Sequence, residues 1–306
     1  MNRTFGSHSG SWVHALAVAF SASWLFGCSA STGESTGPSA GSAPPNTSSV
    51  PSNQGAFSAF CEASAVVAYQ GGYVVADNES DGAIYPFSEQ MTARDLPRPA
   101  EVDVRDVEAL VAMPRGLRSA GSQSTKDNGE VRPKRERVQI VGKKWAPVDF
   151  AGCDECAAAR GKPPKMGGLS VEGAAFWNGG LWFGLRSPLV QKKAILLKMA
   201  GDPATGLTVS EKVQIDLNEF GIRDLTVHNG ALWILAGPAD ESLSAHRLYS
   251  LAEKTAAPAL VRSNLPERSE GITFGPNGAL LVVTDGKGKP GEACTVASTW
   301  RWISPL

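Results

Sequence analysis

The chain has 306 residues, of which 42% are hydrophobic and 19% are charged, and its formal net charge is −1. This length and hydrophobic content allow a sizeable buried core, while the near-zero charge gives no electrostatic footprint for DNA, RNA or an anionic bilayer. Nucleic acid is therefore not expected as a partner, and the 33 Gly and 20 Pro residues favour many short strands joined by tight turns.

The N-terminal segment, residues 1–28, has the pattern of an export signal. A positive charge at Arg3 precedes an apolar run at residues 15–26, which is shorter than the roughly 20 residues that a membrane-spanning helix needs. The segment ends in LFGC, which resembles the bacterial lipobox, in which the Cys is lipidated and becomes the mature N-terminus. Phe26 is bulkier than that motif usually has. The alternative is an ordinary signal peptide in which Cys28 has no role.

Lipidation of Cys28 would attach the protein to a membrane, because several acyl chains together hold a protein firmly to a bilayer surface. Ser29 follows the Cys, at the position where an inner-membrane retention signal would have a residue such as Asp. We therefore expect an outer-membrane lipoprotein of the bacterial cell envelope that faces the periplasm or the cell surface. Residues 29–57, rich in Ser, Gly and Pro, are predicted to be a disordered tether, because they contain too few large apolar residues to offset the entropy of ordering.

The folded domain is predicted to span residues 58–306, and it contains a repeated hairpin pattern. The two clearest copies are VEGAAFWNGGLWFGLRS at residues 171–187 and IRDLTVHNGALWILAGP at residues 222–238. Each has two apolar, strand-like runs around an Asn-Gly turn, which is typical of a β-hairpin. Further copies lie at residues 269–285, at residues 63–79 with a turn at Gly71-Gly72, and, more weakly, from Asp106.

We align the repeats on one residue each: Ser64, Glu108, Glu172, Arg223 and Glu270. The spacings are 44, 64, 51 and 47 residues, and propeller blades recur at roughly 40–50 residues. The sequence therefore predicts an all-β fold, a β-propeller of five or six four-stranded antiparallel blades. A sixth blade would lie in the long interval between Glu108 and Glu172. The alternative is a β-sandwich, which does not require so regular a repeat.

Outer blade strands and a ring closure complete this prediction. A propeller must close its ring, and the stretch Phe57 to Glu62 is left over at the N-terminal end. We therefore expect this N-terminal strand to complete the final blade. The expected outer strands lie at residues 82–87, 137–141, 194–199, 209–217, 246–251 and 299–303.

Four cysteines remain beside Cys28, an even number in a chain bound for an oxidising compartment. We predict one disulfide between Cys61 and Cys294, which would join the closing strand to the last blade, and a second between Cys153 and Cys156. Haem attachment or a zinc site would need additional His or Cys ligands beside the Cys-x-x-Cys pair, and a thioredoxin-like role would need a βαβ context. A structural staple is therefore expected.

The residues that open the repeats should face one another across the central channel, because the innermost strand of each blade lines it. A second polar ring should follow the ends of the next strands. The predicted ligand-binding residues are Glu108, Glu172, Arg186, Arg223, Glu270 and Asp285, and the catalytic candidates are Glu172, Asp224 and Glu270. Such a set could hold a divalent cation through carboxylate oxygens, or an anionic or sugar-like ligand through Arg. The alternative is an ion-pair network that closes the channel.

Four stretches carry a resemblance to a known family: VEGAAFWNGGLWFGLRSP, GIRDLTVHNGALWILAGP, SEGITFGPNGALLVV and GSQSTKDNGEVRPKRER. They resemble the bacterial domain of unknown function 3616 over nearly all of residues 63–285. The resemblance implies a β-propeller and no established activity. The Glu-Gly openings at Glu172 and Glu270 are also similar to those of gluconolactonase-like and phytase-like propellers. Gln123 stands where the related stretch is expected to have His.

These observations predict a secreted, lipid-anchored, monomeric β-propeller that binds a small-molecule or cell-envelope ligand at the channel mouth, as a binding or scaffold module. The alternative is a divalent-cation-dependent hydrolase of a lactone, phosphoester or sugar derivative. In that case Glu172, Asp224 and Glu270 would act as ligands or bases, and Arg186 and Arg223 would orient an anion. The sequence indicates no firm cofactor or metal, and Ca²⁺ is the cation that the alternative would use.

Overall fold

The computed structural model describes residues 53–78, 83–92, 103–240, 242, 244–288 and 293–304. The predicted export signal, the lipobox at Cys28 and most of the predicted tether lie outside these residues. Val50–Leu306 forms one compact unit. None of the helices in the described part of the chain combines the length and the apolar character that crossing a bilayer requires.

Strands account for almost all regular structure, as the sequence predicts. The strands of the first half are β1 (Gln54–Ala56), β2 (Ala63–Ala68), β3 (Tyr73–Asp77), β4 (Ile84–Phe87), β5 (Val107–Met113), β6 (Gly116–Gly121), β7 (Arg137–Ile140) and β8 (Trp145–Asp149). The strands of the second half are β9 (Ser170–Trp177), β10 (Gly180–Ser187), β11 (Ala194–Asp202), β12 (Gly206–Ile215), β13 (Gly221–His228), β14 (Ala231–Gly237), β15 (His246–Leu251), β16 (Ala259–Leu265), β17 (Ser269–Phe274), β18 (Leu280–Thr284) and β19 (Thr299–Ile303). The helices are α1 (Asp154–Ala159) and the 3-10 helix η1 (Pro164–Met166).

The predicted hairpins form through tight turns of the expected chemistry. Asn178 and Gly179 both have positive φ angles, 47° and 71°, at the turn between β9 and β10, as a two-residue type I′ turn requires. Asn229 and Gly230 do the same between β13 and β14. In the first repeat the turn lies one residue earlier than the predicted Gly71-Gly72, because the residues with positive φ angles are Gln70 (50°) and Gly71 (70°).

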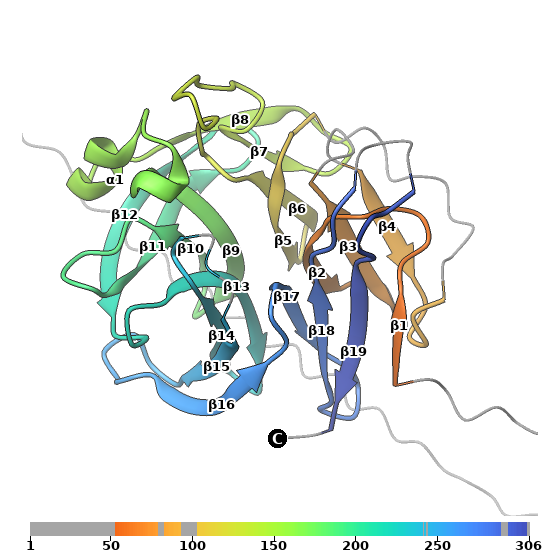
Figure 1. Ribbon diagram of the computed structural model, residues 1–306. Coiled ribbons are helices and arrows are strands. Elements are labelled where there is room, and N and C mark those ends of the chain that lie inside the picture. Colours follow the sequence, from red (N-terminus) through yellow and green to blue (C-terminus); the bar gives the residue numbers. More distant parts are fainter. Residues whose placement is uncertain are drawn as a thin grey trace, which may run out of the picture. The chain divides into compact units, whose positions relative to one another are not determined.

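Further strands extend each hairpin outward, and the fold is a β-propeller. The sheet orders are β2-β3-β4, β13-β14-β15-β16 and β17-β18-β19-β1, and an eight-stranded sheet runs β5-β6-β7-β8-β12-β11-β10-β9. That large sheet joins two antiparallel sets through a short parallel pairing of the outer strands β8 and β12. The inner strands contact one another around the centre in the order β2, β5, β9, β13, β17 and again β2 (Figure 1).

The long interval between Glu108 and Glu172 holds no further inner strand among the described residues. It contains β6, β7 and β8, followed by α1 and η1. The extra length is therefore used by the helical segment, which carries the chain back from the outer edge of one sheet to the centre of the next.

The N-terminal strand lies earlier than predicted. Residues 54–56 form β1 and pair with β19, so the folded part begins within the segment that we assigned to the tether. Phe57 and Phe60, which we placed in the closing strand, are instead core side chains behind it. Gly55 lies against the ring of Trp300, where a Cβ atom would approach within 2.8 Å. A Gln-Gly-Ala strand carries no hydrophobic alternation, so its pairing could not be predicted from pattern.

Buried side chains fill the space between neighbouring sheets. Trp177 and Trp182 pack with Leu196, Ile222 and Ile234 between the β9–β12 strands and the β13–β16 strands. Both indole N–H groups are satisfied, because Trp177 donates to the Gly230 carbonyl (2.9 Å) and Trp182 donates to the Trp177 carbonyl (3.1 Å). These tryptophans are therefore core residues.

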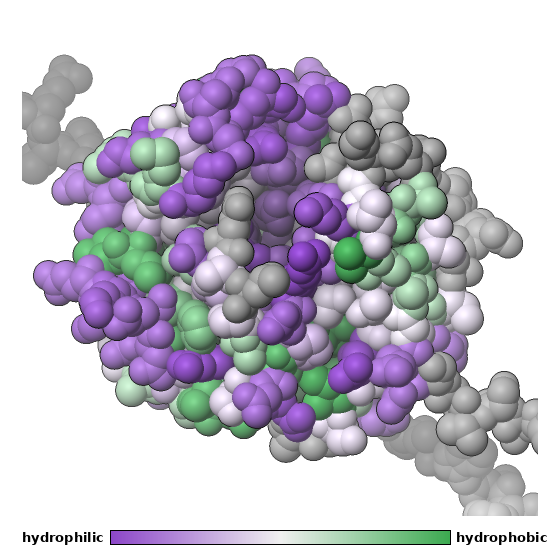
Figure 2. All heavy atoms as spheres, viewed as in Figure 1, coloured by the Kyte–Doolittle hydropathy of each residue, from purple (hydrophilic) through white to green (hydrophobic). Residues whose placement is uncertain are grey.

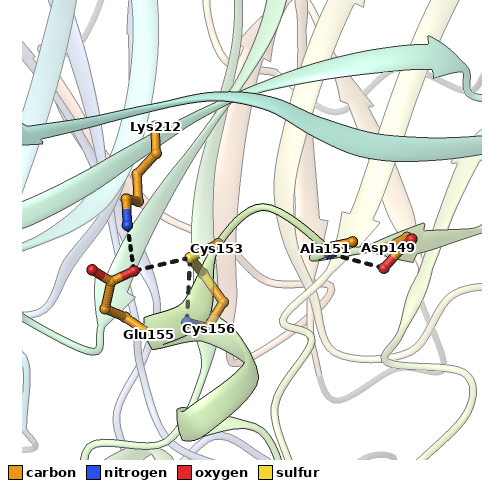
Figure 3. Close-up of a disulfide and its surroundings, with 6 residues drawn as sticks. All are labelled: Asp149, Ala151, Cys153, Glu155, Cys156 and Lys212. Atoms are coloured by element: carbon orange, nitrogen blue, oxygen red, sulfur yellow. Dashed lines mark hydrogen bonds and ion pairs between the residues drawn. A yellow bond between two sulfur atoms is a disulfide. The ribbon is translucent and has the colours of Figure 1, made fainter.

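Both predicted disulfides are present. Cys61 and Cys294 are bonded with their Cα atoms 5.4 Å apart. Cys153 and Cys156 are bonded at the start of α1, where the Cys156 N–H also donates to Cys153 Sγ (3.2 Å; Figure 3). An ion pair of 2.5 Å between Glu155 and Lys212 ties this short helix to β12 (Figure 3). Both sulfur-bearing side chains are buried in a hydrophobic cluster, which is typical of a structural bridge.

Candidate functional site

Each of the five inner strands has a β-bulge at the residue on which we aligned the repeats. In β13, Ile222 pairs with Ala236 and Asp224 pairs with Leu235, so Arg223 is the extra residue. The same irregularity occurs in the other four inner strands. The five bulge residues are Ser64, Glu108, Glu172, Arg223 and Glu270. A bulge re-aims a side chain out of the normal alternation of a strand, so one polar side chain per inner strand leaves the core pattern at the same level.

Four of the five bulge residues line one pocket of about 520 Å³. Side chains from the ends of the second strands complete it. All six predicted ligand-binding residues belong to this lining: Glu108, Glu172, Arg186, Arg223, Glu270 and Asp285. Hydrophilic residues surround the hollow in the face that Figure 2 shows. The fifth bulge residue, Ser64, is instead buried and donates to the Val107 carbonyl of the neighbouring inner strand.

A chain of ion pairs crosses the pocket. Glu172 accepts from Arg186 at 3.0 Å through Oε1 and lies 2.9 Å from Arg223 through Oε2. Arg223 also pairs with Glu270. The order Arg186, Glu172, Arg223, Glu270 therefore alternates in charge, and these side chains are 15%, 6%, 10% and 11% exposed. Such buried, charge-assisted contacts are stronger than surface pairs and hold the groups in fixed positions.

The protein environment changes the acidity of this network. Burial raises the pKa of Glu270 to about 7, although the charge of Arg223 opposes the rise. Burial also raises the pKa of Asp285 to about 8, with a further contribution from Glu270. For Arg223, burial disfavours the charged form, but the carboxylates of Glu172 and Glu270 outweigh it and raise the pKa. The pocket therefore contains a permanent cation beside carboxyl groups that retain a proton near neutral pH.

Glu108 is a further carboxyl group of this kind. Its Oε1 accepts from the side-chain amide of Asn78 at 3.3 Å. Burial, followed by the charges of Asp106 and Glu172, raises the pKa of Glu108 well above its ordinary value. Burial therefore favours the protonated form of the Glu108 carboxyl group, the form that can donate as well as accept a hydrogen bond.

Asp224 does not line the pocket, contrary to its place among the catalytic candidates. Its Oδ1 accepts from the Leu225 N–H and its Oδ2 accepts from the Ile272 N–H, both at 2.7 Å. The side chain is 1% exposed. As the residue after the bulge, Asp224 points away from the channel and joins two neighbouring inner strands, so we assign it a structural role.

Packing explains the two Glu-Gly openings. A Cβ atom on Gly173 would come within 2.9 Å of the Leu225 backbone nitrogen, and one on Gly271 would come within 2.7 Å of the Val66 nitrogen. Glycine after the bulge lets neighbouring inner strands approach closely. The motif therefore serves the assembly of the ring, and it is not by itself a signature of lactonase chemistry.

Several pocket residues were not among our predictions. They are Glu62, Asp240, Ser242, His246, Arg268 and Lys287, whereas Asn78, which also lines the pocket, belongs to the predicted second polar ring. His246 opens β15, a third strand, and is 3% exposed. Burial and the charge of Arg223 lower its pKa to about 4. Arg268 lies beside Asp285, because its carbonyl accepts the Asp285 N–H. Lys287 follows Asp285 by two residues, so extending the repeat at residues 269–285 by two positions would have included it.

Gln123 fills the position where we expected a relative to have His. It is buried, and its side-chain nitrogen donates to the carbonyls of Gly121 (3.2 Å) and Arg135 (3.0 Å). Gln123 therefore holds the loop after β6 and does not line the pocket. In the described part of the chain, no group of three or more His, Cys, Asp or Glu side chains has an arrangement that could hold a metal ion.

Comparison with known families finds a similarity over part of the chain. Residues 161–279 match the family described as "Protein of unknown function (DUF3616)". This confirms the predicted resemblance over β9 to β17, and the earlier stretch GSQSTKDNGEVRPKRER lies outside the matched residues. No curated protein matches the sequence.

Similar solved structures include an exo-β-1,3-galactanase from Phanerochaete chrysosporium, with 8% identity over 82% of this chain and 64% of that chain and a TM-score of 0.49. A β-1,3-galactosidase of glycoside hydrolase family 43 has 10% identity over 78% and 88%, with a TM-score of 0.46. The β-propeller domain of Cps50 (Swd1) from Myceliophteria thermophila has 12% identity over 79% and 96%, with a TM-score of 0.39. At this similarity they carry no argument about chemistry.

Proposed function

We propose that this protein is a secreted, lipid-anchored β-propeller that binds a small polar ligand in the central pocket and serves as a binding module. The observation that carries the proposal is the set of bulges. Four inner strands each direct a charged side chain into one pocket. Buried ion pairs seldom add net stability over apolar residues of similar size, so charged residues at four equivalent positions of the ring favour a role in ligand binding.

The pocket also differs from a network that only closes the channel. Such a network would pair its charges and leave no space. Here about 520 Å³ remains open, a volume within the range of small-molecule sites. Asp285 Oδ1 is buried and makes no hydrogen bond among the described residues. An unsatisfied buried acceptor beside open space favours a ligand that supplies the missing donor.

A ligand screen by thermal shift tests this function. We would screen sugars, sugar acids, amino acids and phosphoesters against the wild type and against the double variant Glu108→Gln/Asp285→Asn. A binding module requires at least one compound that raises the Tm through binding linkage, and the double variant should lose that shift. The exposed Glu253→Gln substitution is the matched control. A shift that persists in the double variant would place binding elsewhere and contradict the proposal.

Acid–base hydrolysis is the second candidate, and the specific observation is the acidity of Glu270 and Asp285. Their pKa values of about 7 and about 8 suit proton transfer near neutral pH. Arg186 and Arg223 would orient an anionic substrate. A divalent cation would have to compete with Arg223 for the carboxylates of Glu172 and Glu270.

Two measurements separate this candidate from the binding module. Purified protein would be assayed on lactones, phosphoesters and aryl glycosides, and thermal melts would be repeated with Ca²⁺, Mg²⁺ and EDTA. Turnover that Glu270→Gln abolishes would establish hydrolysis, and a cation-dependent Tm shift would add a metal to it. Ligand binding without turnover would leave the binding module.

A further inference from the structure

A second cavity of about 490 Å³ adjoins the central pocket. It lies beside the start of β5 and the loop after β6. The two cavities share three lining residues: Glu108, Glu172 and Arg186. Because the Glu172–Arg186 ion pair belongs to the lining of both cavities, the two cavities are neighbouring parts of one groove. Either part alone is within the range of about 300–1,000 Å³ for small-molecule sites, so the groove as a whole is larger than a single sugar or amino acid requires.

Hydrogen bonds hold the polar side chains of this second cavity in place. The Ser122 hydroxyl donates to Asp106 and lies 2.7 Å from the Ser124 hydroxyl. Arg135 donates to Ser124 Oγ at 3.0 Å through one nitrogen and pairs with Asp106 at 3.1 Å through another. Ser122 and Ser124 are buried. The second cavity is therefore a built polar surface whose groups are already oriented for a ligand.

The charges of the second cavity are compensated within the protein. Arg135 pairs with Asp106, Lys126 pairs with Glu130, and Lys165 pairs with Asp127. Eight acidic and six basic residues line the two cavities taken together, and burial raises the pKa values of two of the acidic ones, Glu108 and Asp285. The charges of the lining are therefore nearly balanced, and nothing in the second cavity requires a charged ligand.

Several groups that face the groove can both donate and accept hydrogen bonds. The carboxyl group of Asp285, whose pKa is about 8, does so while it is protonated, and burial raises the pKa of the Glu108 carboxyl group in the same direction. The hydroxyl hydrogens of Ser122 and Ser124 are engaged with Asp106 and with each other, so Ser124 Oγ adds an acceptor to this set. His246 lines the central pocket and is neutral near pH 7. Neither of its ring nitrogens makes a hydrogen bond of ordinary geometry within the described residues. A ligand hydroxyl is the natural partner of such groups, because it also donates and accepts.

We infer that the two cavities form one groove for an uncharged oligosaccharide, with successive sugar units on the two sides of the Glu172–Arg186 pair. This inference rests on the proposed binding function and adds the ligand class and its extended form. No Phe, Tyr or Trp side chain lines either cavity among the described residues. Hydrogen bonds, and not ring stacking, therefore carry the recognition.

Calorimetry with linear malto-, cello-, xylo- and manno-oligosaccharides of one to six units tests the inference on the full chain. In one series the affinity should rise by about tenfold or more from one unit to four, a gain of about 1.4 kcal/mol, and then level off. The ratio of tetramer to monomer affinity should fall toward one in Ser124→Val, which removes a hydroxyl from the second cavity. Asn128→Ala, at the exposed rim of that cavity, is a second variant if Ser124→Val does not fold.

Three outcomes would overturn the inference. Binding that does not depend on length, or a tetramer-to-monomer ratio that survives both second-cavity variants, would leave the proposed function standing with a single-pocket ligand. Tighter binding of oligogalacturonides than of every neutral series would change the ligand class to an anion. If no oligosaccharide binds but the thermal-shift screen finds another ligand that needs Glu108 and Asp285, the function stands and the sugar class falls.

Discussion

Arg223 lies 2.9 Å from the Glu172 carboxylate, and each of these two residues is the bulge of its own inner strand. The contact therefore joins two neighbouring blades at the pocket and not within a sheet. Arg223 continues to Glu270, the bulge of the next inner strand. One guanidinium thus compensates carboxylates from the blades on both of its sides, which makes it the electrostatic centre of the site.

The first prediction concerns this centre. Arg223→Ala should lower the free energy of unfolding by roughly 3–5 kcal/mol, because it leaves buried carboxylates without their cation. Urea unfolding measures the change. The exposed pair of Lys192 and Glu219 (2.7 Å) provides the control, since Lys192→Ala should cost less than roughly 1 kcal/mol. Adding Glu270→Gln to Arg223→Ala should recover part of the lost stability. If Arg223→Ala and Lys192→Ala cost the same free energy of unfolding, Arg223 is not the electrostatic centre of the site.

The second prediction concerns pH and Asp285. Its pKa is about 8 in the folded protein and about 3.9 in an unfolded chain, so between these values the folded state holds a proton that the unfolded state has lost. The free energy of unfolding should therefore fall as pH rises from 4 to 8. In Asp285→Asn this decrease in the free energy of unfolding should be smaller by about 2 kcal/mol. This figure is lower than the full pKa difference implies, because solvent screens a partly exposed carboxyl group.

Urea titrations at pH 4.5, 6 and 8 check this prediction. The variant should gain stability over the wild type at pH 8 and match it at pH 4.5. Glu253→Gln, on the exposed surface, should leave the pH profile of the wild type in place. An Asp285→Asn profile parallel to that of the wild type would show that this carboxyl group is ionised throughout.

The third prediction compares the two disulfides. Cys61 and Cys294 are separated by 233 residues, whereas Cys153 and Cys156 are separated by 3. In the chain-entropy model, a longer loop restricts the unfolded chain more. In this model, replacing the first pair by Ser should cost roughly 5 kcal/mol and replacing the second roughly 2 kcal/mol. Differential scanning calorimetry of the two double variants should give the lower Tm for the first pair, and the reverse order would refute the loop argument.

The fourth prediction tests the structural role of Asp224. Asp224→Ala should cost roughly 2–4 kcal/mol, because the buried N–H groups of Leu225 and Ile272 lose their acceptor. Asp224→Asn keeps one acceptor oxygen and should cost less. Hydrogen exchange at these two amides should quicken in the Ala variant. A loss of ligand affinity in a fully folded Asp224→Asn protein would show that Asp224 takes part in ligand binding and would contradict a purely structural role.

The fifth prediction concerns the proposed anchor. Cys28→Ser should leave the protein unlipidated and soluble without detergent, with the same Tm as the wild type, because residues 1–28 lie far along the chain from the first strand. Membrane fractionation and metabolic labelling with a fatty acid measure this. Unaltered fractionation of the variant with the membrane would rule out the lipobox.

Local sequence pattern was sufficient to predict the repeat and most of the residues that meet at its centre. Asn-Gly turns and alternation of apolar residues are local features, so they identify each hairpin without knowledge of its neighbours. Aligning the hairpins on Glu172, Arg223 and Glu270 was then sufficient to predict their convergence, because equivalent positions in a ring of repeats occupy the same level.

Which of these side chains enter the pocket, and what they contact, depends on how the blades pack together. The bulge turns Arg223 toward the pocket and leaves Asp224 bound to the backbone of β17, and a one-residue irregularity leaves no mark in hydrophobic periodicity. His246 reaches the pocket from a third strand, and β1, which has no hydrophobic alternation, pairs with β19. Contacts between residues so distant in the chain depend on packing and burial, which a local pattern does not encode.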